Sequence, residues 1–319
     1  MPSAKRLSSV AQRLPYLLPG PSAIALSPGR ANDWDSIAVA HTDRREVSTW
    51  NFVRATRGRH WLDPRRFHGK GGEALRVHRR TIATCLCMTR CGNFVVIGYS
   101  SGDVAKFNMQ SGLEYGEFGN KGKVHESTVI GVHVTSVNRV LITVGRGEVK
   151  FWNFSTCKLI DTLDITSSPR FSKFHDESDT LALALSTGEV MLVNVVNRKI
   201  FRRFNNPVTH VCTDLALSSD GTMMVTTHRC DPLIKTWDVV DCKLIDCFRV
   251  QRPATSVAFS PADDLLATTH TACLGVYLWD NRATYQRLHL KPLPEDYVPP
   301  NTAGFIELPT ERLSTRNLD

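Results

Sequence analysis

Short stretches in which apolar and polar residues alternate recur along the chain, and they end in the same way. Alternation with a period of two residues predicts a β-strand that buries one face. The clearest stretches are EVKFWN (148–153), EVMLVN (189–194), LIKTWD (233–238) and GVYLWD (275–280). The next-to-last residue of each stretch is aromatic or apolar, and it is here called the anchor residue. The last residue is Asn or Asp.

The anchor residues recur at a nearly constant interval. The six anchors are Trp50, Phe107, Trp152, Val193, Trp237 and Trp279, separated by 57, 45, 41, 44 and 42 residues. A repeat of about 40 to 45 residues is typical of the blades of a β-propeller. A repeated aromatic residue in a strand of each blade belongs to blade packing before it belongs to a ligand site. We therefore interpret the anchors as structural.

Each anchor strand has strand-like neighbours on both sides. The preceding stretches are β-branched or apolar, and turns rich in Ser, Pro, Asp and Gly lie before them. These stretches include FVVIG, VLITVG, TLALAL, TMMVTT and LLATTH. The stretches that follow the anchors include KLIDTL, KIFRRF and KLIDCF. Together they predict four antiparallel strands per repeat.

The predicted fold class is all-β, a WD-repeat β-propeller with about six recognisable four-stranded blades. Seven blades are commonest in this architecture, so we expect an incomplete ring, in a chain that is part of a larger assembly or a shortened member of its family. We expect a basic N-terminal tail over 1–20, the propeller over 21–290 and a Pro-rich arm over 291–319, lying along a partner or leading to a further domain.

The match to a WD repeat is uneven. No Gly-His dipeptide occurs in the chain, and among the six anchors only Trp237 and Trp279 are followed by Asp to give a true Trp-Asp pair. We therefore expect the usual set of hydrogen-bonded His, Ser/Thr, Trp and Asp side chains to be incomplete. Asp231 and Trp237 are its best-preserved pair, and Asp231 is added to the structural anchors.

The long first interval contains a strongly basic insertion, residues 54–80, here called the basic segment. It carries +7 of the chain's net charge of +8. Trp61, Phe67 and His60 are interleaved with the charges, which suits phosphate contact combined with base stacking. A solvated insertion, or one that binds an acidic protein, remains open. The RNA-binding candidates are Arg54, Arg57, Arg59, Arg65, Arg66, Lys70, Arg76, Arg79 and Arg80.

Other chemistry has little support in the sequence. The nine cysteines are scattered, which suits reduced thiols in a cytosolic or nuclear protein. Cys85, Cys87 and Cys91 lack the spacing of a zinc knuckle, so no metal site is expected. The common catalytic and phosphate-binding motifs are absent, which predicts no enzyme, no cofactor and no small-molecule substrate. No apolar run reaches a membrane span of about 18 residues. A basic tail and an organellar transit peptide both fit the N-terminus.

Three stretches resemble one family specifically. They are NDWDSIAVAHTDRREVSTWNF (32–52), MTRCGNFVVIGYSSGDVAKFNMQSGLEYGEF (88–118) and LATTHTACLGVYLWDNRATYQRLHLKPLPEDYVPP (266–300). They are similar to the second propeller of the family of WD repeat-containing protein 36 and U3 small nucleolar RNA-associated protein 21. The similarity covers about residues 20 to 300 in the same order.

The resemblance implies a non-enzymatic scaffold of the small-subunit processome in the nucleolus, which supports pre-rRNA processing towards 18S rRNA. The implied partners are other propeller proteins of that particle, with U3 small nucleolar RNA and pre-rRNA. Family members carry two tandem propellers and a helical C-terminal region, whereas this sequence shows one propeller at most. The alternative is a substrate-receptor propeller of a ubiquitin ligase or signalling complex, because one fold serves many functions.

Overall fold

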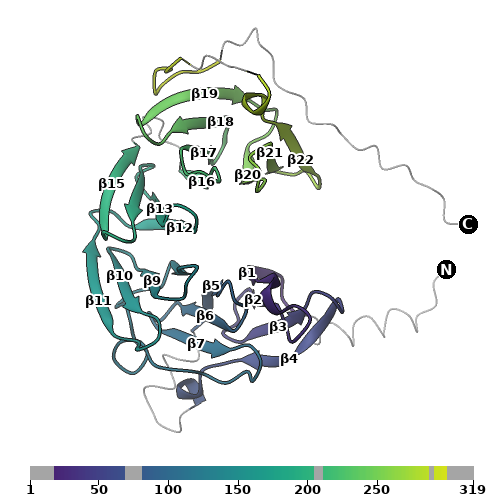
Figure 1. The fold of residues 1–319 in the computed structure, drawn as a ribbon, viewed down its shortest axis with the longest axis vertical. Helices are drawn as coiled ribbons and strands as arrows, with labels where there is room; N and C mark the ends of the chain where they lie inside the picture. The colour runs from purple at the N-terminus through teal and green to yellow at the C-terminus, as the bar shows by residue number, and fades with distance from the viewer. Residues whose placement is uncertain (1–17, 69–80, 205–210, 287–290, 300–319) are drawn as a thin grey trace, which may run out of the picture. The chain divides into compact units, whose positions relative to one another are not determined.

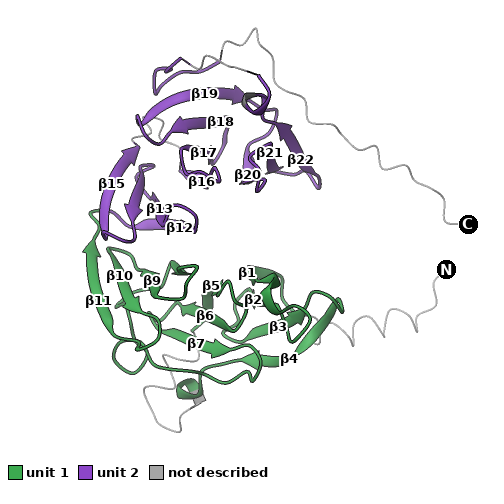
Figure 2. Cartoon of the chain, viewed as in Figure 1, with its two compact units in different colours: residues 1–166 green, residues 167–319 purple. Residues whose placement is uncertain are grey.

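The computed structural model describes residues 18–68, 81–204, 211–286 and 291–299, and its regular structure there is almost entirely β (Figure 1). Short 3-10 helices, Pro28–Arg30 (η2), Arg65–His68 (η3) and Arg282–Thr284 (η4), are the exceptions in this part of the chain. The chain divides into two compact units, residues 1–166 and 167–319, which Figure 2 colours green and purple. The predicted all-β class is confirmed.

Unit 1 contains three antiparallel sheets, in the orders β1-β2-β3-β4, β5-β6-β7 and β11-β10-β9-β8. The strands of the first sheet are Pro21–Leu26 (β1), Ile37–His41 (β2), Val47–Asn51 (β3) and Thr56–Leu62 (β4). Those of the second are Ala83–Met88 (β5), Phe94–Tyr99 (β6) and Val104–Asn108 (β7). Those of the third are Gly131–Val134 (β8), Val140–Val144 (β9), Glu148–Asn153 (β10) and Leu159–Asp164 (β11).

Unit 2 also contains three antiparallel sheets, in the orders β12-β13-β14-β15, β16-β17-β18-β19 and β20-β21-β22. The first consists of Pro169–His175 (β12), Thr180–Leu185 (β13), Val190–Asn194 (β14) and Lys199–Phe204 (β15). The second consists of Cys212–Leu217 (β16), Met223–His228 (β17), Asp231–Asp238 (β18) and Lys243–Arg249 (β19). The third consists of Ala254–Phe259 (β20), Leu265–His270 (β21) and Val276–Asp280 (β22).

The six anchor residues all lie at the end of the third strand of their sheet, as the spacing predicts. In each sheet with four described strands, the pairing of the third and fourth strands shifts register beside the anchor, for example between Thr236 and Trp237. Such a bulge bends a strand and increases its twist. The repeat seen in the sequence is therefore a repeat of backbone geometry, and not only of residue type.

Neighbouring sheets within a unit pack face to face in a constant way. The anchor face of a sheet, which carries the anchor residue, covers the opposite face of the sheet before it. In unit 2, Met224 and Trp237 pack in one core cluster with Ala182 and Leu192 of the preceding sheet. In unit 1, Leu141 and Trp152 pack likewise on the sheet β5–β7. Large side chains on one face thus meet smaller ones on the other, which gives a dense interface.

A complete hydrogen-bonded set, which the sequence did not predict, lies in the sheet β8–β11. The Trp152 indole donates to Thr143 Oγ1 (3.0 Å), and His125 contacts Thr143 Oγ1 through Nε2 (2.9 Å) and Glu148 Oε1 through Nδ1 (2.7 Å). A carboxylate can only accept, so Nδ1 donates to Glu148 and Nε2 accepts from the Thr143 hydroxyl. Burial lowers the pKa of His125, which agrees with a neutral ring.

Two other sheets reach the same arrangement with a histidine from a different place. In the last sheet, Trp279 donates to Thr268 Oγ1 (2.7 Å), Thr268 contacts His270 Nε2 (2.8 Å), and His270 Nδ1 faces the Arg252 carbonyl (2.9 Å). In the first sheet, Trp50 and His41 share the Ser48 hydroxyl, each at 2.8 Å. The histidine here ends the second strand, so no Gly-His dipeptide is required.

The predicted pair of Asp231 and Trp237 is organised differently. Trp237 donates to Thr226 Oγ1 (2.9 Å), and Asp231 accepts from the backbone N–H of Leu233 (3.0 Å). Among the anchors, Phe107, Val193, Trp152 and Trp237 are buried, whereas Trp50 and Trp279 are half-buried.

Residues 291–299, the described part of the expected Pro-rich arm, pack on β19 and its sheet. The Leu293 N–H donates to the Leu244 carbonyl of β19 (2.7 Å), and Leu293 and Tyr297 contact the core cluster around Trp237. The Lys235 amine donates to the Glu295 carbonyl (3.2 Å). Two apolar side chains between the prolines supply the burial that holds this stretch.

Candidate nucleic-acid interface

The basic segment, expected as an insertion between repeats, contains a strand close to its start. Thr56–Leu62 forms β4, the outer strand of the first sheet, paired with β3 from Asn51↔Thr56 to Val47↔Leu62. Leu62 is fully buried and His60 is half-buried on the same face of the strand, whereas Trp61 lies on the opposite, exposed face. The alternation is weak in the sequence because arginines occupy the outward positions, so charge obscured the strand pattern.

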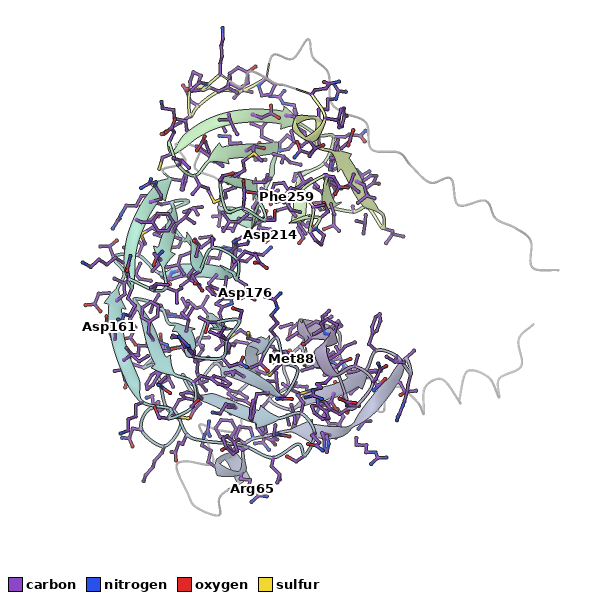
Figure 3. The ribbon with its side chains drawn as sticks, viewed as in Figure 1. Arg65, Met88, Asp161, Asp176, Asp214 and Phe259 are labelled. Atoms are coloured by element: carbon purple, nitrogen blue, oxygen red, sulfur yellow. The ribbon has the colours of Figure 1, made fainter. Side chains whose placement is uncertain are left out.

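The described arginines at this edge are exposed. Arg54, Arg57, Arg59 and Arg65 are all solvent-accessible, and among the described residues no acidic side chain forms an ion pair with any of the four. Arg65 lies on η3 at the periphery of unit 1 (Figure 3). Guanidinium groups without an internal partner can form bidentate hydrogen bonds with phosphate.

An aromatic ring lies beside one of these arginines. The Arg57 guanidinium carbon lies 4.5 Å from the centroid of the Trp61 ring, and Trp61 is 41% exposed. A flat ring beside a guanidinium offers a surface on which an unpaired base can stack. Of the three aromatic side chains proposed for stacking, Trp61 alone among the described residues retains a large exposed surface.

The position of β4 depends on a close approach at Gly58. A Cβ atom there would lie 1.8 Å from Asp35 Oδ2, so that only glycine fits without displacing the carboxylate. Asp35 accepts from the Arg59 N–H (3.2 Å) and from the Thr49 hydroxyl (2.7 Å). The Asp35 carboxylate therefore fixes the backbone of β4 between Arg57 and Arg59, whose guanidinium groups stay in solvent.

Arg66 and Phe67 have internal roles, unlike their neighbours. The Arg66 guanidinium is ion-paired with Glu114 and Asp103 (3.5 Å to Asp103) and donates to the Val104 carbonyl (3.2 Å). Phe67 is 2% exposed and makes an edge-to-face contact with Tyr99, with ring centroids 5.2 Å apart. These side chains attach η3 to the sheet β5–β7, so the charge of Arg66 is already compensated.

The remaining RNA-binding candidates, Lys70, Arg76, Arg79 and Arg80, lie outside the described residues. His60 is half-buried, and its Nε2 donates to the Gln110 carbonyl (3.1 Å). The described part of the interface therefore consists of Arg54, Arg57, Arg59, Trp61 and Arg65. In the sequence, this interface is marked by a tryptophan, Trp61, that stands among arginines in a short stretch.

Other chemical groups in the described residues do not form a second site of this kind. No group of three or more His, Cys, Asp or Glu side chains there is arranged to hold a metal ion. Cys85 and Cys87 lie half-buried on β5, and burial raises the pKa of the Cys85 thiol to about 12, which makes it a poor nucleophile at neutral pH. In the part of the chain that the structure describes, no helix has the length and apolar character to cross a bilayer.

Antiparallel sheets of three or four strands, repeated with an anchor residue at the end of each third strand, define a WD-repeat β-propeller. A family model described as the WDR36/Utp21 second beta-propeller domain matches residues 3–309. The chain belongs to this family, as the resemblance of its three characteristic stretches indicated.

Curated relatives agree with the family match. The chain is 38% identical over 283 residues to WD repeat-containing protein 36 of Homo sapiens, which covers 88% of this chain and 30% of the relative. It is 34% identical over 282 residues to the U3 small nucleolar RNA-associated protein 21 homolog of Schizosaccharomyces pombe, with 88% and 30% covered. For U3 small nucleolar RNA-associated protein 21 of Saccharomyces cerevisiae, the identity is 29% over 289 residues, with 90% and 28% covered. The chain spans less than a third of the length of these relatives.

Proposed function

We propose that this chain is a non-enzymatic scaffold of the small-subunit processome in the nucleolus, supporting pre-rRNA processing towards 18S rRNA. Membership of the WDR36/Utp21 family supports this role, and two relatives are named as proteins associated with U3 small nucleolar RNA. A scaffold requires surfaces and not a reaction centre. Its proposed partners are other propeller proteins of that particle, with U3 small nucleolar RNA and pre-rRNA.

The exposed arginines of β4 and η3 are proposed to contact RNA. The observation that supports this role is a set of exposed guanidinium groups without ion pairs to described acidic residues, one of which, that of Arg57, lies beside the accessible Trp61 ring. Phosphate contacts supply affinity without sequence specificity, and the indole adds stacking with a single-stranded base. Lys70, Arg76, Arg79 and Arg80 belong to the same segment and are proposed to extend the surface.

The RNA contact is tested by replacing Arg54, Arg57, Arg59 and Arg65 with Ala together. Binding of a fluorescent single-stranded segment of U3 RNA is measured over a range of salt concentrations. Each lost phosphate contact should reduce the slope of log K against log salt by about 0.7. We expect weaker binding and a shallower slope in the variant, at unchanged thermal stability.

A charge-matched control separates a local surface from overall charge. Arg139, Arg146, Lys158 and Lys199 are exposed and belong to strands or turns of the sheets β8–β11 and β12–β15, so their joint replacement by Ala removes the same charge. The control should retain most of the affinity and slope. Equal losses in the two variants would show that total charge, and not the surface around Trp61, attracts RNA.

A further inference from the structure

A lysine amine is buried between two sheets of unit 1. Lys106 lies on β7 directly before the anchor Phe107, and it is 1% exposed. Its amine donates to the Phe154 carbonyl in the turn after β10 (2.8 Å), and among the described residues no carboxylate forms an ion pair with it. Aromatic rings surround the amine, with centroids 4.5 to 5.7 Å away: Phe94, Tyr115, Phe118 and Phe154. Rings and a carbonyl thus take the place of water around this amine.

The amine faces a cysteine thiol. Lys106 Nζ lies 3.7 Å from Cys157 Sγ. Cys157 is half-buried in the turn between β10 and β11, where Ser155 and Thr156 are exposed. Both reactive atoms border the space beside Gly116, because a Cβ atom there would lie 2.7 Å from the sulfur and 3.4 Å from the amine nitrogen. Since Gly116 is exposed, a small molecule can reach the sulfur from the solvent.

A second cysteine occupies the same position of the repeat without a lysine beside it. Cys242, in the turn between β18 and β19, has the same left-handed backbone conformation as Cys157, with φ of 55° and 58°. Cys242 packs on the core cluster that contains Leu192, which lies directly before its anchor as Lys106 does. Its sulfur contacts a backbone carbonyl (3.9 Å). A leucine therefore satisfies the packing of this position, and the amine of Lys106 adds chemistry that packing does not require.

Burial also favours the nucleophilic form of the Lys106 amine. It lowers the pKa of the amine, and the neighbouring Cys157 sulfur opposes this shift only in part. A neutral amine can donate an N–H to the Phe154 carbonyl and still direct its lone pair at the sulfur. Lysines in apolar surroundings act as nucleophiles in this way. The pair thus combines an amine nucleophile with a thiol that the solvent reaches.

We propose that Lys106 and Cys157 form a redox-sensitive covalent link, a sulfenamide, when hydrogen peroxide reaches the thiol. The Cys157 thiolate attacks one peroxide oxygen. The S–O bond forms, the O–O bond breaks and hydroxide leaves, so sulfur is oxidised to the sulfenic acid and peroxide is reduced. The Lys106 amine then attacks the sulfur. The S–N bond forms, the S–O bond breaks, and the leaving hydroxide takes a proton from the nitrogen, so that one peroxide gives two waters in all.

The link is reversible by thiols. A thiolate attacks Cys157 Sγ, the S–N bond breaks, and the Lys106 nitrogen takes up a proton, which leaves a mixed disulfide. A second thiol attacks that disulfide and releases the free Cys157 thiol. While it exists, the link ties β7 to the turn between β10 and β11, and so joins the sheets β5–β7 and β8–β11 covalently.

Peptide mass spectrometry of the purified chain tests the link. The chain is treated with hydrogen peroxide, alkylated without reduction and digested. We expect a joined pair of peptides that contains Lys106 and Cys157, lacks two hydrogen atoms relative to the separate peptides, and is lost after treatment with dithiothreitol. It should be at least about tenfold more abundant than any peptide linked through Cys242, because an amine is held beside Cys157 and a leucine beside Cys242.

Two variants separate the roles of the amine and the thiol. Lys106→Leu copies the residue found at the equivalent position, Leu192, so it should fold, which thermal unfolding checks. Without the amine, the sulfenic acid of Cys157 has no partner to condense with, and its labelling by dimedone should rise several-fold over the wild type. Cys157→Ser keeps the amine and should give no joined peptide at Lys106.

Other results with the wild-type chain overturn the proposal, whether or not the variants fold. If Cys157 stays unmodified while the exposed Cys230 is oxidised, peroxide does not reach the thiol. If Cys157 is recovered only as an unlinked oxidised acid, the amine does not attack it. A joined peptide that keeps one further oxygen would contradict the direct S–N bond. Equal dimedone labelling of the wild type and of a folded Lys106→Leu variant would also contradict the proposal.

Discussion

His125 shows how one buried side chain links the strands of a repeat through hydrogen bonds. It receives a hydrogen bond from Thr143 and donates one to Glu148, and its side chain is 1% exposed. Gly145 makes room for the ring, because a Cβ atom there would lie 2.6 Å from His125 Nδ1. In the last sheet the ring of His270, at the end of β21, completes the same arrangement. Histidines from different positions in the repeat thus make corresponding hydrogen bonds in the two sheets.

The depressed pKa of His125 predicts a pH dependence of stability. Burial is the largest cause of the shift, so the unfolded chain takes up a proton at a higher pH than the native protein. The contribution of this group is therefore fully present above the unfolded pKa of about 6.5 and is lost as the pH falls below it. The loss cannot exceed about 1.4 kcal/mol per pH unit for one group.

Urea unfolding at pH 7 and pH 5 measures this effect, with His125→Gln as the comparison. Glutamine can accept from Thr143 and donate to Glu148 without titrating. We expect the wild-type protein to lose more stability on acidification than the variant. Burial also lowers the pKa of His133 (to about 4) and of His270, so both proteins should retain some dependence in the same direction. Equal losses would contradict the role assigned to His125.

At the scale of single residues, the sequence shows which side chains are charged or aromatic, but not which of them lie inside the protein and which at its surface. Arg66 resembles its neighbours in sequence, but its ion pairs with Asp103 and Glu114 join residues far apart in the chain. Phe67 was expected to stack on a base, and it packs on Tyr99. Long-range partners of this kind leave no periodic pattern, so sequence reasoning could not separate the internal arginine from the exposed ones.

At the scale of elements, the third strand of each repeat was predictable, and the structure has every anchor where the spacing placed it. The alternation and the Asn or Asp after each anchor were sufficient. The histidine networks were missed because the sequence was searched for Gly-His. For the network of the last sheet, the tripeptide Thr-Thr-His at 268–270 was the available indication. Strand β4 was not predicted because four of its residues are charged or aromatic, so that apolar and polar residues do not alternate clearly along it.

Matched positions in two sheets give a direct test of the packing. Ile234 and Val276 occupy equivalent positions, at 0% and 65% exposure. Replacing Ile234 with Asp buries an unpaired charge and should destabilise the purified chain by about 3 kcal/mol or more. Replacing Val276 with Asp should change the stability of the purified chain by less than about 0.5 kcal/mol, as is usual for a surface position.

Thermal and urea unfolding of both variants decide this prediction. The test concerns the purified chain alone. A large destabilisation by Val276→Asp would mean that the face of β22 that carries Val276 is already buried within the purified protein. A small effect of Ile234→Asp would contradict the packing of β18 against the sheet β20–β22.

At the scale of the whole molecule, the two units share one design. Each contains three antiparallel sheets, and in each the anchor face of one sheet covers the opposite face of the sheet before it. The predicted class followed from the period of the repeat. The packing of residues 291–299 on β19 did not follow from the repeat, because closely spaced prolines leave no strand or helix pattern in this stretch.

The proposed function at this scale depends on assembly. The proposed scaffold would use the exposed arginines of β4 and η3 for RNA, and loss of these arginines should reduce RNA contact.

The central claim is that the chain functions within particles that contain U3 small nucleolar RNA. Density-gradient sedimentation of cell extract containing the tagged chain tests it, with every fraction probed for the tag and for U3 RNA. We expect the chain to sediment with U3 RNA in large pre-ribosomal particles. Migration as a free protein or a small complex separate from U3 RNA would contradict the scaffold role.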